Sequence, residues 1–201
     1  MPGALCSLSD AASVAITIDD GPHAEATPRA LDALDEAGLR ATFFLSGERV
    51  REQRALVRDI HERGHGIGNH GHRHERMFLL SRARIEKSVR TTSEASAEAT
   101  GTLPRYFRPP YGQWNPAMTS VLDTLGLRLV LWNCMPGDYL PGMRDEEWAS
   151  ALQRTVRGGS IIVLHDNAKT ADSIGPNIRA LASVLHRRKL SSVLLPGEAQ
   201  P

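Results

Sequence analysis

The stretch VAITIDDGPH, residues 14–23, joins a run of four apolar residues and one threonine to two adjacent acids and a Gly-Pro pair. Residues 14–18 form a short apolar run, which is typical of a strand buried on both faces of a parallel sheet. The Gly-Pro pair favours a turn, so Asp19 and Asp20 are expected where that strand ends. In parallel α/β folds, the carboxyl ends of the strands form the active site. The stretch therefore predicts both a fold class and the place of its chemistry.

Outward from this stretch, short apolar runs alternate with helical patterns along the whole chain. The alternation predicts an α/β fold with about seven parallel strands, and an open doubly wound sheet and a closed or partly closed barrel both fit it. For the first helix, Thr27 is the expected N-cap and Pro28 the first helical residue. The expected helices begin near residues 27, 49, 81, 115, 145 and 174 and end near residues 38, 63, 101, 126, 158 and 188. The expected strands cover residues 14–18, 41–45, 65–68, 106–107, 127–132, 160–164 and 192–195.

The bulk composition fits one domain over residues 1–201, with the informative motifs between about residues 12 and 196. The chain has 24 Lys and Arg residues against 23 Asp and Glu residues. It therefore lacks the excess of basic residues that is typical of proteins that bind nucleic acids or anionic membranes. Cys6 and Cys134 lie far apart, so neither a disulfide scaffold nor a thiolate metal cluster is expected. Residues 1–13 do not resemble a signal peptide and no run is long enough to span a membrane, so a cytoplasmic location is the default expectation. The oligomeric state stays open.

Three histidines lie in the stretch GNHGHRH, residues 68–74, directly after the third expected strand. Two imidazoles and one carboxylate suit Zn²⁺ or a similar divalent ion and leave a coordination position for water. His70 and His74 would face one way on a helical turn, whereas all three histidines would share a face in an extended segment, so His72 stays ambiguous. An acidic turn or a histidine-rich loop can each be merely structural. Their joint placement after two strands of one sheet favours a metal site.

Polar residues also follow the later strands, in the stretches FRPPYG, MPGDY and LHD. Arg108 beside two prolines is more typical of a solvent-facing residue than of a catalytic one. Asp138 can be a simple turn residue. His165 follows four apolar residues at a strand end, where a histidine can donate a proton or serve a structural role.

Together these motifs resemble the polysaccharide deacetylases of carbohydrate esterase family 4, which share the NodB-homology domain. The resemblance covers nearly the whole chain, and it implies a distorted (β/α) barrel with about seven parallel strands. It also implies hydrolytic removal of N-acetyl groups from an acetylated sugar or polysaccharide, such as a chitooligosaccharide or peptidoglycan. The stretches that carry it are TIDDGPH, ATFFLSG, HGIGNHGHRH, FRPPYG, WNCMPGDY and IIVLHDN.

The resemblance implies a metal site formed by Asp20, His70 and His74, while His72 falls on a position that does not bind the metal. The ion would be Zn²⁺, with Co²⁺ and Ni²⁺ as alternatives because they accept the same ligands.

The resemblance also implies the catalytic groups. Asp19 would be the general base, and Arg108 would hold its carboxylate. His165 would be the general acid, with Asp138 as its partner. The backbone N–H of Tyr111 would help to stabilise the oxyanion.

The sequence departs from the commonest family pattern at three positions. Gly71 stands where a hydroxyl residue is usual, Met135 where an acid is frequent, and Tyr139 where a tryptophan is frequent. These positions concern the substrate groove and its support, so they leave the substrate open. An O-acetyl esterase and a small-molecule amidohydrolase are the enzymatic alternatives, and a non-catalytic carbohydrate-binding module is the alternative from another class.

Overall fold

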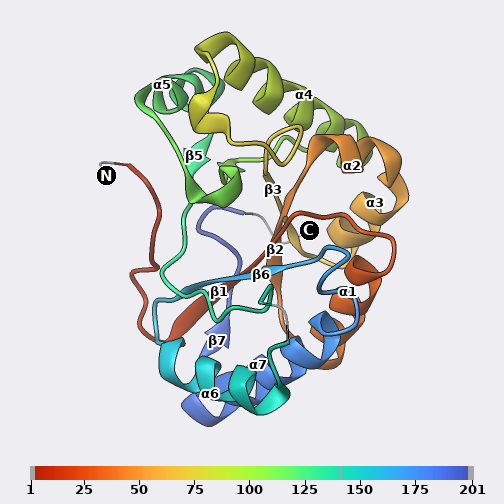
Figure 1. The fold of residues 1–201 in the computed structure, drawn as a ribbon, viewed down its shortest axis with the longest axis vertical. Coiled ribbons are helices and arrows are strands. Elements are labelled where there is room, and N and C mark those ends of the chain that lie inside the picture. The colour runs from red at the N-terminus through yellow and green to blue at the C-terminus, as the bar shows by residue number, and fades with distance from the viewer. Residues whose placement is uncertain (1–2, 141, 199–201) are drawn as a thin grey trace.

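The computed structural model describes residues 3–140 and 142–198, and an all-parallel sheet curled into a partly closed barrel forms its centre (Figure 1). The strand order is β5-β4-β3-β2-β1-β6, with β7 pairing β1 beside this path. The α/β fold with about seven parallel strands is confirmed for the described residues. The strands are β1 (Ser13–Asp19), β2 (Ala41–Leu45), β3 (Gly66–Asn69), β4 (Tyr106–Phe107), β5 (Arg128–Leu129), β6 (Ile161–His165) and β7 (Ser191–Ser192).

The two ends of the sheet approach each other through the segment that follows β5. Val130 forms a bridge to the N-terminal segment, and Cys134 forms a parallel bridge to Ile162 in β6. The segment thus leaves the edge of β4 and crosses to β6, which is why the strand expected over residues 127–132 already ends at Leu129. This crossing turns a curled sheet into a distorted barrel.

Helices cover the outside of the sheet, because β1 and β2 are buried along their whole length and need apolar cover. Figure 1 shows α1, α6 and α7 toward one end of the molecule and α4 and α5 toward the other. The α-helices are α1 (Ala26–Glu36), α2 (Gly47–Glu52), α3 (Arg54–Glu62), α4 (Arg82–Thr100), α5 (Pro116–Leu125), α6 (Asp145–Thr155) and α7 (Ile174–Arg188), and the short 3₁₀ turns are η1 (Met77–Leu79) and η2 (Pro110–Gly112).

The start of α1 differs from the expectation. The helix begins at Ala26 with Glu25 as its N-cap, so the prediction of Thr27 as N-cap is wrong. The Thr27 side chain is instead buried, and its hydroxyl donates to Oδ2 of Asp166 at 2.5 Å. Pro28 therefore occupies the third helical position, where its missing N–H costs no hydrogen bond because the first four N–H groups of a helix have no partner within it.

Other boundaries differ by smaller amounts. The single helix expected over residues 49–63 is two helices, because Gln53 leaves the helical conformation with φ −124° and ψ 41°. Asn115 caps α5 as expected, and its side chain accepts the backbone N–H of Met118 at 2.9 Å. Ser81 is the N-cap of α4, but its side chain makes no capping hydrogen bond.

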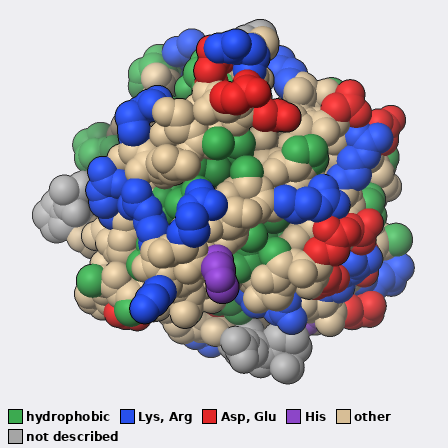
Figure 2. All heavy atoms as spheres, turned by 90° about the horizontal axis from the view of Figure 1, so that it is seen from below, with side chains coloured by type: hydrophobic (Ala, Val, Ile, Leu, Met, Phe, Trp, Pro, Cys, Tyr) green, Lys and Arg blue, Asp and Glu red, His purple; other side chains and the backbone are tan. Residues whose placement is uncertain are grey.

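Charged side chains of both signs cover the face seen in Figure 2, where Lys and Arg spread widely and Asp and Glu lie among them toward the borders. Arg154, Arg187 and Arg188 of α6 and α7 line a shallow cavity. Arg188 also donates to the backbone oxygen of Gln153 at 2.6 Å, so it holds the end of α6 against α7. No helix in the described ranges combines the length and the apolar character that a membrane crossing requires.

Candidate active site

The last residues of β1 and β6 bring two expected catalytic groups side by side. Asp19 ends β1, His165 ends β6, and the two residues are direct partners in the parallel pairing. Side chains at paired positions of neighbouring strands project from the same face of a sheet. The carboxylate and the imidazole therefore lie at one mouth of the barrel.

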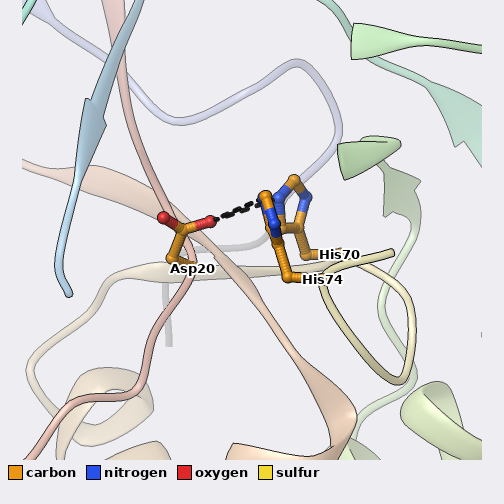
Figure 3. Close-up of side chains that lie close together, drawn as sticks. All are labelled: Asp20, His70 and His74. Atoms are coloured by element: carbon orange, nitrogen blue, oxygen red, sulfur yellow. Dashed lines mark ion pairs between the residues drawn. The ribbon is translucent and has the colours of Figure 1, made fainter. Parts of the chain in front are cut away.

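Asp20, His70 and His74 form a cluster beside this pair (Figure 3). Each offers one ligand atom, and these atoms all lie within 4.8 Å of one another. Residues 70–76 form neither a helix nor a strand, so a bend of the loop brings the two histidines together. His72 is not a member of this cluster, although it lines the same cavity.

The ring of His70 is held in one tautomer by the backbone. Its Nδ1 lies 2.8 Å from the carbonyl oxygen of Arg108, which can only accept, so Nδ1 carries the proton. The lone pair of Nε2 is then free on the side of Asp20 (Figure 3). Burial lowers the pKa of His74, although the charge of Asp20 acts in the opposite direction. Burial therefore favours the neutral, metal-binding form of His74, and the backbone contact orients the ring of His70.

The three side chains fit a divalent cation. Oδ1 of Asp20 is buried without a hydrogen-bond partner among the described residues, and it lies 3.2 Å from Nε2 of His74 and 3.6 Å from Nε2 of His70. Ligand atoms at the usual zinc distances in a tetrahedral site lie about 3.3 Å apart. Burial would raise the pKa of Asp20, but His70, His74 and His165 together lower it below the usual range. Asp20 is therefore an ionised carboxylate facing two imidazole nitrogens.

The Asp19 carboxylate is held by a buried arginine. Nη1 of Arg108 donates to Oδ1 of Asp19 at 2.7 Å and to Oγ1 of Thr17 at 2.6 Å. Arg108 is fully buried, and its guanidinium lies over the ring of Phe44, 4.2 Å from the ring centroid. The arginine expected to face solvent on composition alone is therefore a fixed counter-ion that orients Asp19.

Arg108→Met is expected to lower the free energy of unfolding by about 3–5 kcal/mol, because it leaves the buried Asp19 carboxylate without its counter-ion. Urea denaturation of the metal-free protein at neutral pH measures this loss. Arg29→Met is a matched control, because Arg29 pairs at 2.7 Å with Asp172 on the exposed surface. Its expected cost is at most about 1 kcal/mol. If both substitutions lower the free energy of unfolding equally, Arg108 does not stabilise the fold as the buried counter-ion of Asp19.

His165 is held by Asp138 through two contacts. Oδ2 of Asp138 accepts the backbone N–H of His165 at 2.7 Å, and Oδ1 lies 3.0 Å from Nδ1 of the ring. Burial would lower the pKa of His165, but the hydrogen bond to Asp138 and the charges of Asp138, Asp19 and Asp20 raise it to about 9. The imidazole is therefore protonated at neutral pH, while Nε2 remains free to donate.

The pKa of His165 predicts the basic limb of the pH–rate profile. A general acid must be protonated to act, so kcat/KM is expected to fall as the pH rises through about 9. Asp138→Asn removes the charge-assisted hydrogen bond and is expected to move this limb to lower pH by about 1–2 units. Asp172→Asn, on the exposed surface, is the control and should leave the limb in place. A limb that does not move in Asp138→Asn would show that another group controls it.

Asp19, His165 and the cluster of Asp20, His70 and His74 all line one cavity of about 730 Å³. Aromatic side chains form part of its wall: the Tyr111 ring packs on His74 with centroids 4.5 Å apart, and the Tyr139 ring packs on His165 at 5.3 Å. Both tyrosines are exposed. Met135 also lines the cavity, so two of the positions at which the sequence departs from the family pattern, Met135 and Tyr139, lie in the cavity wall.

Backbone conformation marks two of the site residues. Asp20 and Tyr111 have positive φ angles of 84° and 61°, which residues with a side chain rarely adopt. Such strain collects at functional sites, where the surrounding structure enforces it. Gly71 has φ 77°, and a Cβ there would lie 2.8 Å from Sδ of Met77, so a residue with a side chain would be strained at this position.

The sequence interpretation missed two asparagines that support the cluster. Asn69 donates to the backbone oxygen of Val89 at 2.7 Å and accepts the N–H of Gly71 at 2.8 Å, so it fixes the bend between the histidines. Asn167 donates to Asp20. An amide next to His70 or next to the LHD stretch was the available signal, but polar loop residues are too common for it to be distinctive.

The chain is similar to known proteins over most of its length. A sequence model of the polysaccharide deacetylase family matches residues 9–130. The chitooligosaccharide deacetylase of Rhizobium leguminosarum bv. trifolii is 32% identical over 200 residues, which cover 94% of this chain and 92% of that protein. The family 4 carbohydrate esterase of Streptomyces lividans, solved in complex with acetate, aligns with a TM-score of 0.83 and 32% identity over 92% of this chain and 94% of that one. A family 4 acetyl xylan esterase of Clostridium thermocellum, solved with a cobalt ion, aligns with a TM-score of 0.83 and 33% identity over 90% of this chain and 87% of that one. The chain therefore belongs to the polysaccharide deacetylase family of hydrolases.

Proposed function

We propose that this chain is a metal-dependent enzyme that hydrolyses the N-acetyl groups of an acetylated glycan, with a chitooligosaccharide as the first candidate substrate. The observation that carries the proposal is the placement of Asp19 and His165 on paired strand ends, beside a cation-binding cluster and in one cavity. A base held by an arginine and an acid held by an aspartate serve no purpose in simple binding, which disfavours a non-catalytic module. The similarity to a chitooligosaccharide deacetylase supports the substrate class.

Asp20, His70 and His74 would hold the cation, which we propose to be Zn²⁺, with Co²⁺ and Ni²⁺ as alternatives. When bound there, the ion supplies Lewis acidity that polarises the acetyl carbonyl and lowers the pKa of water. The cobalt ion in the Clostridium thermocellum relative supports this choice of ions.

Two residues divide the proton transfers between them. Asp19 would accept the proton of the attacking water, and the hydrogen bond from Arg108 orients its carboxylate. His165 would then give its proton to the departing nitrogen, and Asp138 keeps the ring in the tautomer that leaves Nε2 as the donor. The proposal thus pairs an oriented carboxylate with an imidazole whose pKa is raised to about 9, which supplies an acceptor and a donor of protons for this chemistry.

Tyr111 would stabilise the negative charge that develops on the former carbonyl oxygen. Its backbone N–H is the proposed donor, and the loss of one such donor typically costs about 3 kcal/mol of transition-state stabilisation. The exposed Tyr111 side chain at the cavity wall leaves space beside it for a sugar ring.

An O-acetyl esterase is the second candidate, because the acetyl xylan esterase of Clostridium thermocellum shares the fold, with a TM-score of 0.83, and is 33% identical in sequence. The same base and acid could serve an alcohol leaving group, which needs less help from protonation than an amine. A small-molecule amidohydrolase is the remaining alternative.

Measurement of acetate release from three kinds of substrate distinguishes the deacetylase, esterase and amidohydrolase activities. The zinc-loaded protein is expected to release acetate from N-acetylated chitooligosaccharides with a higher kcat/KM than from O-acetylated xylan or from a small N-acetylated amide. Asp19→Asn protein, measured on the same substrates, controls for hydrolysis by contaminants. Faster release from xylan would favour the esterase, and faster release from the small amide would favour the amidohydrolase. A metal-loaded protein that releases acetate from none of them would overturn the proposal.

A further inference from the structure

The side-chain amide of Asn167 contacts the carboxylate of the cation-binding cluster. Its Nδ2 donates to Oδ2 of Asp20 at 2.7 Å, and Asn167 lies in the loop directly after β6. Its Oδ1 accepts the backbone N–H of Lys169 at 2.8 Å. Because a backbone N–H can only donate, this second contact decides which end of the amide is oxygen, and Nδ2 must face Asp20.

The loop around Asn167 is closely tied to the strand end. The N–H of Asn167 donates to Oγ1 of Thr170 at 3.1 Å, and the same hydroxyl donates to the carbonyl oxygen of His165 at 2.6 Å. The N–H of Thr170 in turn donates to the carbonyl oxygen of Asn167 at 3.1 Å. Both the backbone and the amide of Asn167 are thus fixed relative to β6.

These contacts divide the two oxygens of Asp20 between two tasks. Oδ2 is occupied by the Asn167 amide, and Oδ1 faces His70 and His74 at 3.6 Å and 3.2 Å. Asp20 already has a constrained backbone with φ 84°, so rotation of its carboxylate is the main freedom that remains. A donor on Oδ2 removes that freedom.

We propose that Asn167 is a positioning residue for the cation site: it locks the Asp20 carboxylate so that a single oxygen is presented to the two imidazoles. This inference rests on the proposed function, because it assumes that the cluster binds a divalent cation. Groups that orient metal ligands commonly contribute about 10- to 100-fold to metal affinity.

The simpler interpretation is that Asn167 is only a turn residue whose Oδ1 caps the N–H of Lys169. Two substitutions distinguish the roles. Asn167→Asp keeps the capping oxygen and nearly the same shape, but replaces the donor on Oδ2 of Asp20 with an acceptor. Asn167→Ala removes both contacts. A turn role alone predicts nearly normal behaviour for Asn167→Asp and a larger defect for Asn167→Ala, whereas the positioning role predicts that Asn167→Asp is at least as defective.

The experiment measures Zn²⁺ and Co²⁺ affinity by calorimetry on the full chain, together with the visible absorption spectrum of the Co²⁺-loaded protein. We expect Asn167→Asp to weaken affinity by about 10- to 100-fold and to change the Co²⁺ spectrum, because Asp20 is then free to turn. Asn133→Asp is the matched control: Asn133 also accepts a backbone N–H through Oδ1, that of Ile161 at 2.8 Å, but at the opposite end of β6. It should leave both affinity and spectrum unchanged.

Equal or tighter binding by Asn167→Asp, with an unchanged Co²⁺ spectrum, would overturn the role of Asn167 and leave the proposed function standing. So would a control Asn133→Asp protein that weakens binding as much as Asn167→Asp. A wild-type protein that binds neither ion would instead count against the proposed function itself, so the two failures are distinguishable.

Discussion

Asp19→Asn is expected to lower kcat by about 10²- to 10⁴-fold while the protein keeps its fold and its metal. The amide nearly reproduces the shape of the carboxylate, and its oxygen can still accept from Nη1 of Arg108. It cannot take a proton from water at neutral pH, so only the proposed base function is lost. Because Asp19 does not belong to the Asp20 cluster, Zn²⁺ affinity should change little.

The measurement is kcat and KM for acetate release, together with the metal content of the same protein sample. Asp172→Asn serves as the control, because Asp172 is an exposed aspartate whose one ion pair among the described residues is with Arg29 at the surface. It should retain full turnover. A kcat of Asp19→Asn within a few-fold of the wild type would remove Asp19 from the role of base, and a loss of metal would place Asp19 in the cation site instead.

His70→Ala is expected to abolish metal binding and activity together. His70 is one of the three proposed ligands, and the contact between its Nδ1 and the carbonyl oxygen of Arg108 directs its Nε2 toward the cluster. Removal of a supporting contact typically lowers metal affinity roughly 10- to 100-fold, and removal of a ligand itself should lower it by more. Zinc content after dialysis, and its recovery when Zn²⁺ is added back, measure the effect.

His72→Ala is the matched control for His70→Ala, because His72 lies two residues away in the same loop and lines the same cavity but is absent from the cluster. It is expected to keep its metal. If His72→Ala loses zinc as fully as His70→Ala, the assignment of ligands in this loop is wrong. If His70→Ala keeps both zinc and activity, the proposed metal dependence fails.

The parallel sheet could be predicted from the sequence because its central strands are short apolar runs. β2 has the predicted bounds, β1 extends one residue beyond them at each end, and β6 begins and ends one residue later than predicted. Burial of these strands on both faces leaves a strong pattern in the sequence. The strand after Leu127 was predicted too long because an apolar run does not reveal that the chain leaves one strand and crosses to another. The course of that segment is set by tertiary contacts.

The residue types of the candidate site could be predicted from the sequence, but their arrangement in space could be predicted only in part. The sequence indicated histidines and acids at strand ends, but not that a loop bend would bring His70 and His74 together. Thr27 was misread as a helix cap because its hydroxyl is used by Asp166, which is distant in sequence. The contact of Asn167 with Asp20 joins residues 147 positions apart, and local patterns carry no information on such a pair.

The pairing of Asp19 with His165 has a consequence for assembly of the barrel. Side chains alternate between the two faces along a strand. A shift of β6 by one residue against β1 would therefore place the His165 imidazole on the face opposite the Asp19 carboxylate. Only the correctly aligned barrel can then bring the two proton-transferring groups together. Catalytic activity would therefore require the correct register of β6 against β1. Molecules with a shifted register would be inactive even if they were compact.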